Sequence, residues 1–411
     1  MTSRKWIISQ IGAREHYAVP RALHDRGLLT HLYTDAWCPY GKLLLRQMPD
    51  PIRSLANRYH SDLPTEDVTS FTARAIKNRI TSYKKDISRT SLQYYEHHRQ
   101  IGACFAQSVR DDLRNRSFNL KNSVFFGYNT GCLETIEQLS KADCLTIVDQ
   151  IDPGRVHKEI VREESKRWSS WSLQTPMPYK PFEDRLMAEW ELASIVVVNS
   201  EWSKKALIQQ GVDSSKIEIV PLAYEASVVP NFPSSRKEKL HILWLGRVSL
   251  AKGIPYLINA ARRLQDKPVK FSIVGPIHIT EEAIASAPSN VTFTGRVSRN
   301  ETADWYRQAD IFILPTLSDG FAITQLEAMA HGLPVIATPN CGRVVTHQKD
   351  GFIIPPRDAD AIAETIAGLV NRHTQIEALS VQAFETSQKF TLNRVADRLA
   401  EIVSDYDSNC V

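Results

Sequence analysis

Short runs of apolar and β-branched residues alternate along this chain with segments of helical periodicity, and this alternation limits the fold more than any other feature. The runs are bounded by Gly, Asn, Asp or Ser, and the segments between them repeat apolar residues every three or four positions. Strands that alternate with helices form βαβ units, whose sheets are parallel and buried on both faces. The expected strands are residues 5–9, 124–126, 145–148 and 195–198 in the first half, and 240–245, 270–274, 291–293, 311–314, 335–337 and 352–354 in the second.

Two such series predict an α/β protein with two doubly wound domains. Residues 224–239 separate the series, contain two prolines and a run of Ser and Lys, and show no clear periodicity. A length of 411 residues is sufficient for two or three domains. We expect helices at about 15–26 and at 201–210, the second capped by Ser200.

Composition excludes several classes of protein. Hydrophobic residues make up 43% of the chain and charged residues 23%, which are globular values and exclude a mainly disordered, collagen-like or coiled-coil chain. The six cysteines are scattered, with no C-x-x-C pair, which argues against a zinc site or a disulfide framework. The first residues hold too short an apolar run for a signal peptide, and no apolar stretch is long enough to span a membrane. We expect a cytoplasmic protein.

Positive charge is concentrated in residues 71–121. This segment has 11 Lys and Arg against 4 Asp and Glu, a net +7, while the whole chain has a net charge of only +4. The local excess fits a solvated basic helix packed on the first domain. It also fits a patch for an anionic membrane surface or a phosphate-bearing acceptor, which would place the protein at the inner face of the membrane.

The segment 243–253 has the pattern of an anion site. A buried strand ends at Gly246, and Arg247 and Lys252 follow in a loop that opens a helix. Backbone amides and the positive end of a helix favour an anion, and the two cations add fixed charge. A diphosphate fits this pattern, although two ordinary surface cations after a strand would also produce it.

The segment 318–336 carries two carboxylates eight residues apart. Asp319 lies in a glycine-containing turn after a strand, and Glu327 lies in the following, otherwise apolar helix. A carboxylate among apolar residues is costly to bury unless it is hydrogen-bonded, and ribose hydroxyls would satisfy it. The start of this helix would also supply the free backbone amides of residues 321–323. The alternative is a helix-capping aspartate and a partly exposed glutamate.

Together the two segments resemble the second domain of retaining glycosyltransferases of the GT-B architecture, glycosyltransferase family four, also called the group one glycosyl transferases. Residues 310–334 are similar to the family's pair of acids spaced by seven residues, its helix of small residues and its Gly-x-Pro-Val-Ile strand. Residues 198–200, 216–222 and 295–297 are also similar to the family. The resemblance covers residues 195–367 well and the first 190 weakly.

This resemblance implies a fold of two facing Rossmann-like domains with a cleft between them. Residues 1–225 would bind the acceptor, residues 226–390 would bind the nucleotide sugar, and residues 391–411 would form a helix that packs back on the first domain. The implied activity is transfer of a sugar from a nucleoside-diphosphate sugar, UDP- or GDP-linked, to an acceptor hydroxyl with retention at the anomeric carbon. The enzyme would be of the hexosyltransferase type and independent of metal, with a polysaccharide, a glycolipid or a small metabolite as acceptor.

The family's functional residues have counterparts in this sequence. Arg247 and Lys252 match the pair that holds the donor diphosphate and stabilises the leaving group, and Asp319 matches the acid that contacts the donor sugar. Glu327 matches the acid that binds the ribose. The remaining donor-binding counterparts are Gly12, Gly246, Val297, Phe321, Ala322 and Ile323.

Three positions depart from the family's pattern. Asp319 stands where Glu is usual, which withdraws the carboxylate by about one bond length. Ala322 replaces a glycine, and we expect that it needs no positive φ and narrows the sugar pocket. The strand 145–148 is followed by Asp149 and not by a histidine, so Asp149 is a candidate sugar or acceptor contact, as is Asn129 after the strand 124–126.

Other functions remain open at this stage. A nucleotide-sugar hydrolase or epimerase would use the same fold, and a non-catalytic nucleotide-sugar scaffold would fit the changes at Asp319 and Ala322. A peripheral membrane module would fit the basic segment. The D-x-D pattern at Asp358 and Asp360 opens a helix and is explained by capping, so it does not indicate a metal site.

Overall fold

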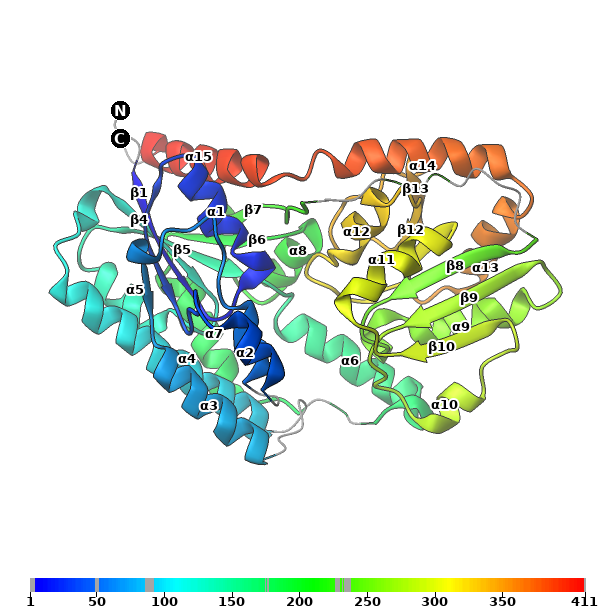
Figure 1. The fold of residues 1–411 in the computed structure, drawn as a ribbon, viewed down its shortest axis with the longest axis horizontal. Coiled ribbons are helices and arrows are strands. Elements are labelled where there is room, and N and C mark those ends of the chain that lie inside the picture. The colour runs from blue at the N-terminus through cyan, green and yellow to red at the C-terminus, as the bar shows by residue number, and fades with distance from the viewer. Residues whose placement is uncertain are drawn as a thin grey trace.

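The computed structural model describes residues 4–48, 52–85, 92–173, 175, 177–225, 230, 232 and 238–409, without the side chains of 81–85, 299 and 300. The chain forms two parallel sheets in separate halves, each with helices on both faces (Figure 1). This arrangement confirms the predicted α/β class. Most of the linker predicted at residues 224–239 lies outside the described residues.

The first sheet has seven strands in the order β3-β2-β1-β4-β5-β6-β7, all parallel. Its two faces are both buried because successive side chains point to opposite sides, so that Ile7 and Phe125 join one core while Ile8 and Phe126 join the other. The strands are β1 (Lys5–Gln10), β2 (Leu29–Thr34), β3 (Val68–Ser70), β4 (Ser123–Tyr128), β5 (Leu145–Gln150), β6 (Ile195–Val198) and β7 (Ile217–Ile219).

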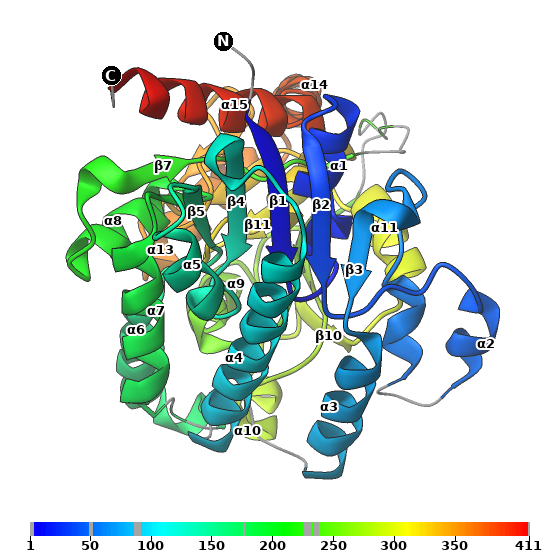
Figure 2. The same cartoon turned by 90° about the vertical axis from the view of Figure 1, so that its left-hand side faces the viewer.

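Helices of the first half cover this sheet and extend to one side of it (Figure 2). They are α1 (Ala18–Asp25), α2 (Lys42–Gln47), α3 (Thr72–Lys85), α4 (Leu92–Asn115), α5 (Leu133–Leu139), α6 (Arg155–Arg167), α7 (Lys180–Leu192) and α8 (Glu201–Gln209). Ser200 caps α8 as predicted, because its side chain accepts the backbone N–H of Ser203.

The predicted helix at residues 15–26 is wrong at its start. The α-helix begins only at Ala18, because Glu15, His16 and Tyr17 all have positive φ, between 40° and 62°. A continuous helix requires negative φ, so this turn delays α1 by a full turn. It also places Glu15 at the edge of the sheet.

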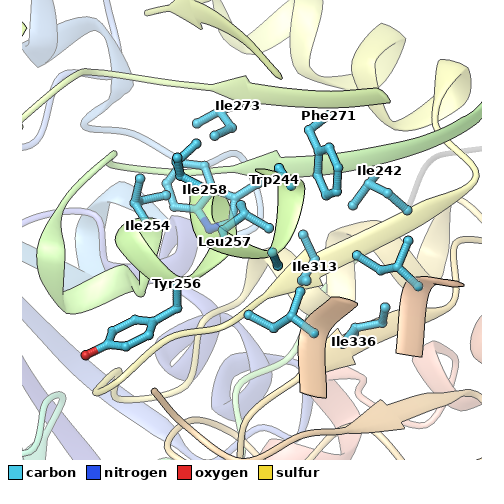
Figure 3. Close-up of a cluster of buried hydrophobic side chains, with 14 of the residues drawn as sticks. Ile242, Trp244, Ile254, Tyr256, Leu257, Ile258, Phe271, Ile273, Ile313 and Ile336 are labelled. Atoms are coloured by element: carbon cyan, nitrogen blue, oxygen red, sulfur yellow. The ribbon is translucent and has the colours of Figure 1, made fainter. Parts of the chain in front are cut away.

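The second sheet has six parallel strands in the order β10-β9-β8-β11-β12-β13. Its core packs Trp244, Ile313 and Ile336 from the strands against Leu257 and Ile258 of α9 (Figure 3). The strands are β8 (Leu240–Leu245), β9 (Val269–Val274), β10 (Val291–Gly295), β11 (Ile311–Leu314), β12 (Val335–Ala337) and β13 (Gly351–Ile353). The helices are α9 (Ile254–Arg263), α10 (Glu281–Ala285), α11 (Arg299–Gln308), α12 (Thr324–Ala330), α13 (Ala359–Leu369), α14 (His373–Ser387) and α15 (Leu392–Asn409).

Two helices cross from one half to the other. The last helix, α15, leaves the second half and lies over the first sheet, with Leu399 and Ile402 in the core beside α1 (Figure 1). In the opposite direction α6 follows β5 and enters the second half, where Trp168 and Trp171 pack in the core. Each half is therefore completed by a helix from the other part of the chain.

A buried ion pair fixes α6 in the second half. The Glu164 carboxylate is fully buried and accepts hydrogen bonds from the Arg357 Nε at 2.7 Å and from the Tyr256 hydroxyl at 2.8 Å. The neighbouring Glu163 pairs with the same Arg357 at 2.9 Å but is 62% exposed. The two glutamates thus share a partner and differ in burial.

No helix in the described part of the chain is long and apolar enough to cross a membrane.

The difference between the two glutamates gives a stability prediction. Glu164→Ala removes a buried carboxylate together with the hydrogen bonds that it accepts from Arg357 and Tyr256, so we expect the free energy of unfolding to fall by about 2–4 kcal/mol. Glu163→Ala removes an exposed pair with the same arginine and should cost about 0–1 kcal/mol. Urea unfolding followed by tryptophan fluorescence measures both values, and equal losses in the two variants would contradict the role given to Glu164.

Candidate functional site

A cavity of about 330 Å³ lies between the two halves, where the carboxyl ends of both sheets meet. This is the edge at which parallel α/β sheets place their ligands. The first half lines the cavity with Arg14, Glu15, Asp149, Ile151, Asn199 and Leu222. The second half lines it with Trp244, Leu245, Gly246, Arg247, Lys252, Leu314, Asp319 and residues 321–324.

Lys252 and Asp319 form an ion pair in this cavity. The Lys252 Nζ contacts the Asp319 Oδ2, and the two side chains are 24% and 19% exposed. Lys252 ends a short turn of 3₁₀ helix and is followed by Gly253 at φ 73°, where any β-carbon would collide with the Pro315 carbonyl. Only glycine fits that position, so the turn holds Lys252 beside the loop that carries Asp319.

Three backbone amides open into the cavity beside this pair. Phe321, Ala322 and Ile323 lie just before α12, and within the described structure none of their N–H groups donates a hydrogen bond. The loop that carries these amides is also bound to the first half, because the Ser200 Oγ donates a hydrogen bond to the Gly320 carbonyl at 2.5 Å. Arg247 follows β8 on the same wall of the cavity and is exposed. Unpaired amides and two cations make this wall suitable for an anion.

Ala322 corrects one expectation from the sequence. It has φ 61°, in the left-handed region, whereas we expected that alanine here would need no positive φ. An alanine in this region is strained by about 1–2 kcal/mol because its β-carbon approaches the following carbonyl. The backbone therefore keeps the geometry that glycine usually adopts and places a methyl group at the cavity wall.

Glu327 lies outside the cavity lining and is half-buried. Its Oε2 accepts a hydrogen bond from the Tyr306 hydroxyl at 2.8 Å, and burial together with this carboxylate raises the pKa of Tyr306 well above its usual value. The Tyr306 ring in turn stacks on His331 at 4.8 Å. A tyrosine thus supplies one of the hydrogen bonds that a carboxylate in this apolar helix requires.

Three other predicted residues also lie outside the lining. Val297 is half-buried in the loop after β10 and packs on the core around α12. The Gly12 amide donates to the Asp35 carboxylate at 2.8 Å. Asn129 is 7% exposed, and its Oδ1 has no hydrogen-bond partner among the described residues. The cavity therefore gathers eight of the twelve residues singled out in the sequence.

Asp149 is a buried carboxyl group at the end of β5, on the cavity wall opposite Lys252. Burial raises its pKa to about 8, with the nearby Glu15 carboxylate adding to the rise and the Arg14 guanidinium opposing it. Asp149 is therefore largely protonated at neutral pH and able to donate a hydrogen bond. Arg14 and Glu15 were not predicted, because only the unusual turn at residues 15–17 brings them to the cavity.

His157 is a further residue that the sequence did not reveal. It lies in α6, and its ring is near the backbone of Ser318 and the charged groups of Lys252 and Asp319. Burial lowers its pKa, and Lys252 lowers it further, while Asp152 and Asp319 act in the opposite direction. No histidine directly follows β5 in the sequence, but the crossing of α6 into the second half brings this more distant histidine to the site.

The D-x-D pattern is explained by local structure. Asp358 caps α13 by accepting the Ala361 N–H at 2.8 Å, and Asp360 pairs with Arg263. Across the described ranges there is no group of three or more His, Cys, Asp or Glu side chains that could hold a metal ion.

Comparison with known proteins identifies the family. The family described as Glycosyl transferases group 1 matches residues 239–372, the part that holds Arg247, Lys252, Asp319 and Glu327. Residues 239–372 belong to the group 1 glycosyl transferases. It spans about half the length of the curated relatives that it matches first.

Two curated relatives and two solved structures illustrate the similarity. The D-inositol 3-phosphate glycosyltransferase of Pseudarthrobacter chlorophenolicus is 27% identical over 43% of this chain and 47% of its own length. The amylovoran biosynthesis glycosyltransferase AmsK of Erwinia amylovora is 27% identical over 68% of this chain and 69% of its own. Sucrose-phosphate synthase from Thermosynechococcus elongatus shares the fold with a TM-score of 0.67 at 16% identity, over 99% and 100% of the two chains. Anabaena HepE in complex with UDP-glucose does so with a TM-score of 0.55 at 16% identity, over 98% and 100%. These likenesses confirm the GT-B fold.

The raised pKa of Asp149 predicts a pH-dependent contribution to stability. Folding raises this pKa from 3.8 to about 8, so the contribution of Asp149 to stability is largest below pH 4 and is lost as the pH rises to 8. Asp149→Asn removes this titration, and we expect the variant to exceed the parent by roughly 2–5 kcal/mol at pH 8 and to match it near pH 4. Urea unfolding at both pH values measures the difference. Asp266→Asn, at a 73% exposed site, is the control, and a pH-independent gain at Asp149 would refute the assignment.

The positive φ of Ala322 predicts that glycine is preferred there. Ala322→Gly should stabilise the protein by about 0.5–1 kcal/mol, because relief of strain exceeds the added entropy of the unfolded chain. The same change at Ala378, an exposed position within α14, should cost about 1 kcal/mol. Thermal unfolding separates the two cases, and a loss of stability at both positions would contradict the strain at Ala322.

Proposed function

We propose that this protein is a retaining glycosyltransferase that moves a sugar from a nucleoside-diphosphate sugar to an acceptor hydroxyl. The observation that carries the proposal is the convergence of Arg247, Lys252 and three unpaired backbone amides on one cavity between the two halves. A diphosphate is the anion that such a wall fits, since its oxygens accept hydrogen bonds from amides and cations together.

Lys252 and Asp319 form an ion pair that a bound donor would have to break. A bound diphosphate would compete with Asp319 for the Lys252 ammonium and free the carboxylate to accept hydrogen bonds from sugar hydroxyls. As the bond between sugar and phosphate breaks, negative charge accumulates on the leaving phosphate, where Arg247 and Lys252 stabilise it. Asp319 would therefore affect how both the diphosphate and the sugar of the donor bind.

The reaction proceeds at the front face of the sugar in this proposal. A double displacement needs an ionised carboxylate as nucleophile, and Asp149 does not suit that role because its raised pKa keeps the carboxyl largely neutral. The departing phosphate oxygen takes the proton of the acceptor hydroxyl while the new glycosidic bond forms. Asp149 then serves as a hydrogen-bond donor to sugar or acceptor, and Asn129, with its unpartnered Oδ1, as an acceptor contact.

The remaining predicted roles follow the family. Glu327 would bind the ribose through the oxygen that Tyr306 does not occupy, Val297 would contact the base, and Gly12 would approach the donor across the cleft. Residues 226–390 would form the donor domain and residues 1–225 the acceptor domain, with 391–411 completing the latter.

The donor and acceptor are proposed by analogy. The solved complex of HepE with UDP-glucose makes a UDP-sugar the first donor to test, with GDP-sugars second. AmsK, a relative of amylovoran biosynthesis, favours a polysaccharide or glycolipid acceptor over a small metabolite. A cytoplasmic location at the inner face of the membrane, with peripheral contact through segment 71–121, belongs to the same proposal. Within residues 71–121, the side chains of Lys84 and Lys85 are not among those that the structure describes.

Titration calorimetry with nucleoside diphosphates and their sugars tests this function. We expect selective binding of one nucleotide and product formation from its sugar in an acceptor screen. Lys252→Ala should lower kcat by about 100-fold or more with a smaller loss of donor affinity, because its contact strengthens in the transition state. Lys270→Ala, at an exposed position of β9, should change neither value.

Two results would overturn parts of this proposal. Donor binding without turnover under all acceptor conditions would favour the non-catalytic scaffold. A Lys252→Ala variant that loses donor affinity and kcat/KM equally, with kcat intact, would show that Lys252 only binds the donor.

A further inference from the structure

Two arginines converge on one aspartate at the edge of the first sheet. Asp35 directly follows β2, Arg58 follows the short helix η2 (Arg53–Asn57), and Arg79 lies in α3. The Arg58 Nη1 and the Arg79 Nη2 each lie 3.7 Å from a different oxygen of the Asp35 carboxylate. All three side chains are between 15% and 18% exposed, so the cluster is largely but not fully buried.

The charges in this cluster do not balance. Two guanidinium groups face one carboxylate, and that carboxylate already accepts the Gly12 amide at 2.8 Å. At 3.7 Å neither arginine makes a direct hydrogen bond to it. Arg79 donates to the Ser54 Oγ, whereas the Arg58 side chain makes no hydrogen bond within the described part of the chain. Burial lowers the pKa of Arg79, the like charge of the nearby Arg58 lowers it further, and the Asp35 carboxylate opposes both effects.

The cluster lies one loop away from the cavity between the halves. Gly12 has φ 96°, and a β-carbon on it would lie only 2.9 Å from the Arg58 Nη1, so glycine lets this guanidinium approach the loop. Two and three residues further on, Arg14 and Glu15 line the cavity. Residues 12–15 therefore join the arginine cluster to the site proposed for the sugar, on the side of the first half.

We propose that Arg58 and Arg79 bind the phosphate group of a phosphate-bearing acceptor. Guanidinium groups present paired N–H donors that match phosphate oxygens, and a phosphate would neutralise the excess charge beside Asp35. The assignment to an acceptor rests on the proposed glycosyltransferase function, because the donor diphosphate is assigned to Arg247 and Lys252 across the cavity. Binding of phosphate itself does not depend on that function.

The surface beside the cluster indicates where such a phosphate would come from. Helix α2 contacts η2 and carries Leu43 and Leu44, which are 77% and 67% exposed, while Tyr40 just before it is 88% exposed. Figure 2 shows α2 projecting from the body of the first half beside α3. Lys42 and Arg46 lie on the same helix and are exposed. Exposed leucines among cations suit the interface of an anionic membrane, which favours a phosphate carried on a lipid.

Phosphate binding is tested first with inorganic phosphate. The parent for this experiment is Arg247→Gln/Lys252→Gln, which removes the proposed donor anion site, and the phosphate-dependent rise of its unfolding temperature reports binding. We expect Arg58→Gln and Arg79→Gln to weaken phosphate at least tenfold. Arg53→Gln, an exposed arginine on η2, should stay within twofold. Unchanged phosphate affinity in the Arg58 and Arg79 variants would overturn the proposal.

Conservative variants guard against loss of folding. Arg58→Lys and Arg79→Lys keep the charge beside Asp35 and lose the paired donors, so each should fold and bind phosphate more weakly than the parent. Parent-like phosphate affinity in both lysine variants together with both glutamine variants would show that the arginines serve the fold alone.

The source of the phosphate is tested in two arms. Glycerol 3-phosphate provides a soluble phosphate ester, and phosphatidylcholine vesicles containing phosphatidic acid provide a lipid one. A lipid source predicts that Leu43→Ser/Leu44→Ser weakens vesicle binding about tenfold and leaves glycerol 3-phosphate binding unchanged, while Arg58→Gln weakens both. Vesicle binding that is indifferent to Leu43, Leu44 and Arg58 would exclude the lipid source, and retained glycerol 3-phosphate binding would then support a soluble acceptor.

Nucleotide binding separates this inference from the proposed function. UDP should bind Arg58→Gln with the affinity of the natural chain, because the donor site is on the other wall. If no nucleoside diphosphate binds the natural chain and phosphate still binds through Arg58 and Arg79, the glycosyltransferase proposal fails and the anion site stands.

Discussion

The buried carboxylate of Glu164 holds together the geometry on which the site depends. It lies on α6, which leaves the carboxyl end of β5 in the first sheet and enters the core of the second half, where Arg357 and Tyr256 bind it. In exchange, α15 returns from the second half to cover the first. Nothing within a parallel sheet orients it toward a second sheet. The crossing helices therefore determine that the carboxyl edges of both sheets meet at one cavity. The same crossing places His157 near the Lys252–Asp319 pair. Helix α6 therefore both joins the two halves and supplies a side chain to the site.

Within the cavity the two walls differ in their electrostatics. The wall of the second half offers cations and unpaired amides, whereas the wall of the first half offers the carboxyl groups of Glu15 and Asp149, both with pKa values raised by burial. An anion is therefore attracted to one wall, and a neutral, hydroxyl-rich group fits the other. The shorter side chain of Asp319 suits this division. Asp319 forms an ion pair with Lys252 and fills less of the space opposite Asp149 than a longer glutamate would.

The sequence predicted those features that local chemistry determines. The strands 195–198, 240–245, 311–314 and 335–337 were placed at their observed bounds, because buried parallel strands are short apolar runs with polar punctuation. The anion wall was predicted because Gly246, Arg247 and Lys252 are close in sequence. What could not be predicted depends on long-range packing or on unusual backbone angles. Residues 15–17 and Ala322 have positive φ although none of them is a glycine, the residue that usually indicates such a conformation. His157 and Arg14 reach the site only through the tertiary fold.

The first half gave the weakest sequence signal and carries the charge pattern that separates two anion sites. Arg58 and Arg79 come from segments far apart in the sequence, and only the order β3-β2-β1 places Asp35 and the Gly12 loop beside them. Each cationic site holds two cations and one aspartate, Asp319 in the cavity and Asp35 in the first half, so positive charge is in excess at both. Arg247, Lys252 and the unpaired backbone amides lie together on the wall of the second half, and the carboxyl groups of Glu15 and Asp149 on the opposite wall offer a diphosphate no such set of donors. A donor would therefore bind on the side of Arg247. The loop of residues 12–15 would lie between the donor diphosphate and the acceptor phosphate, while the donor sugar and the acceptor hydroxyl meet in the cavity.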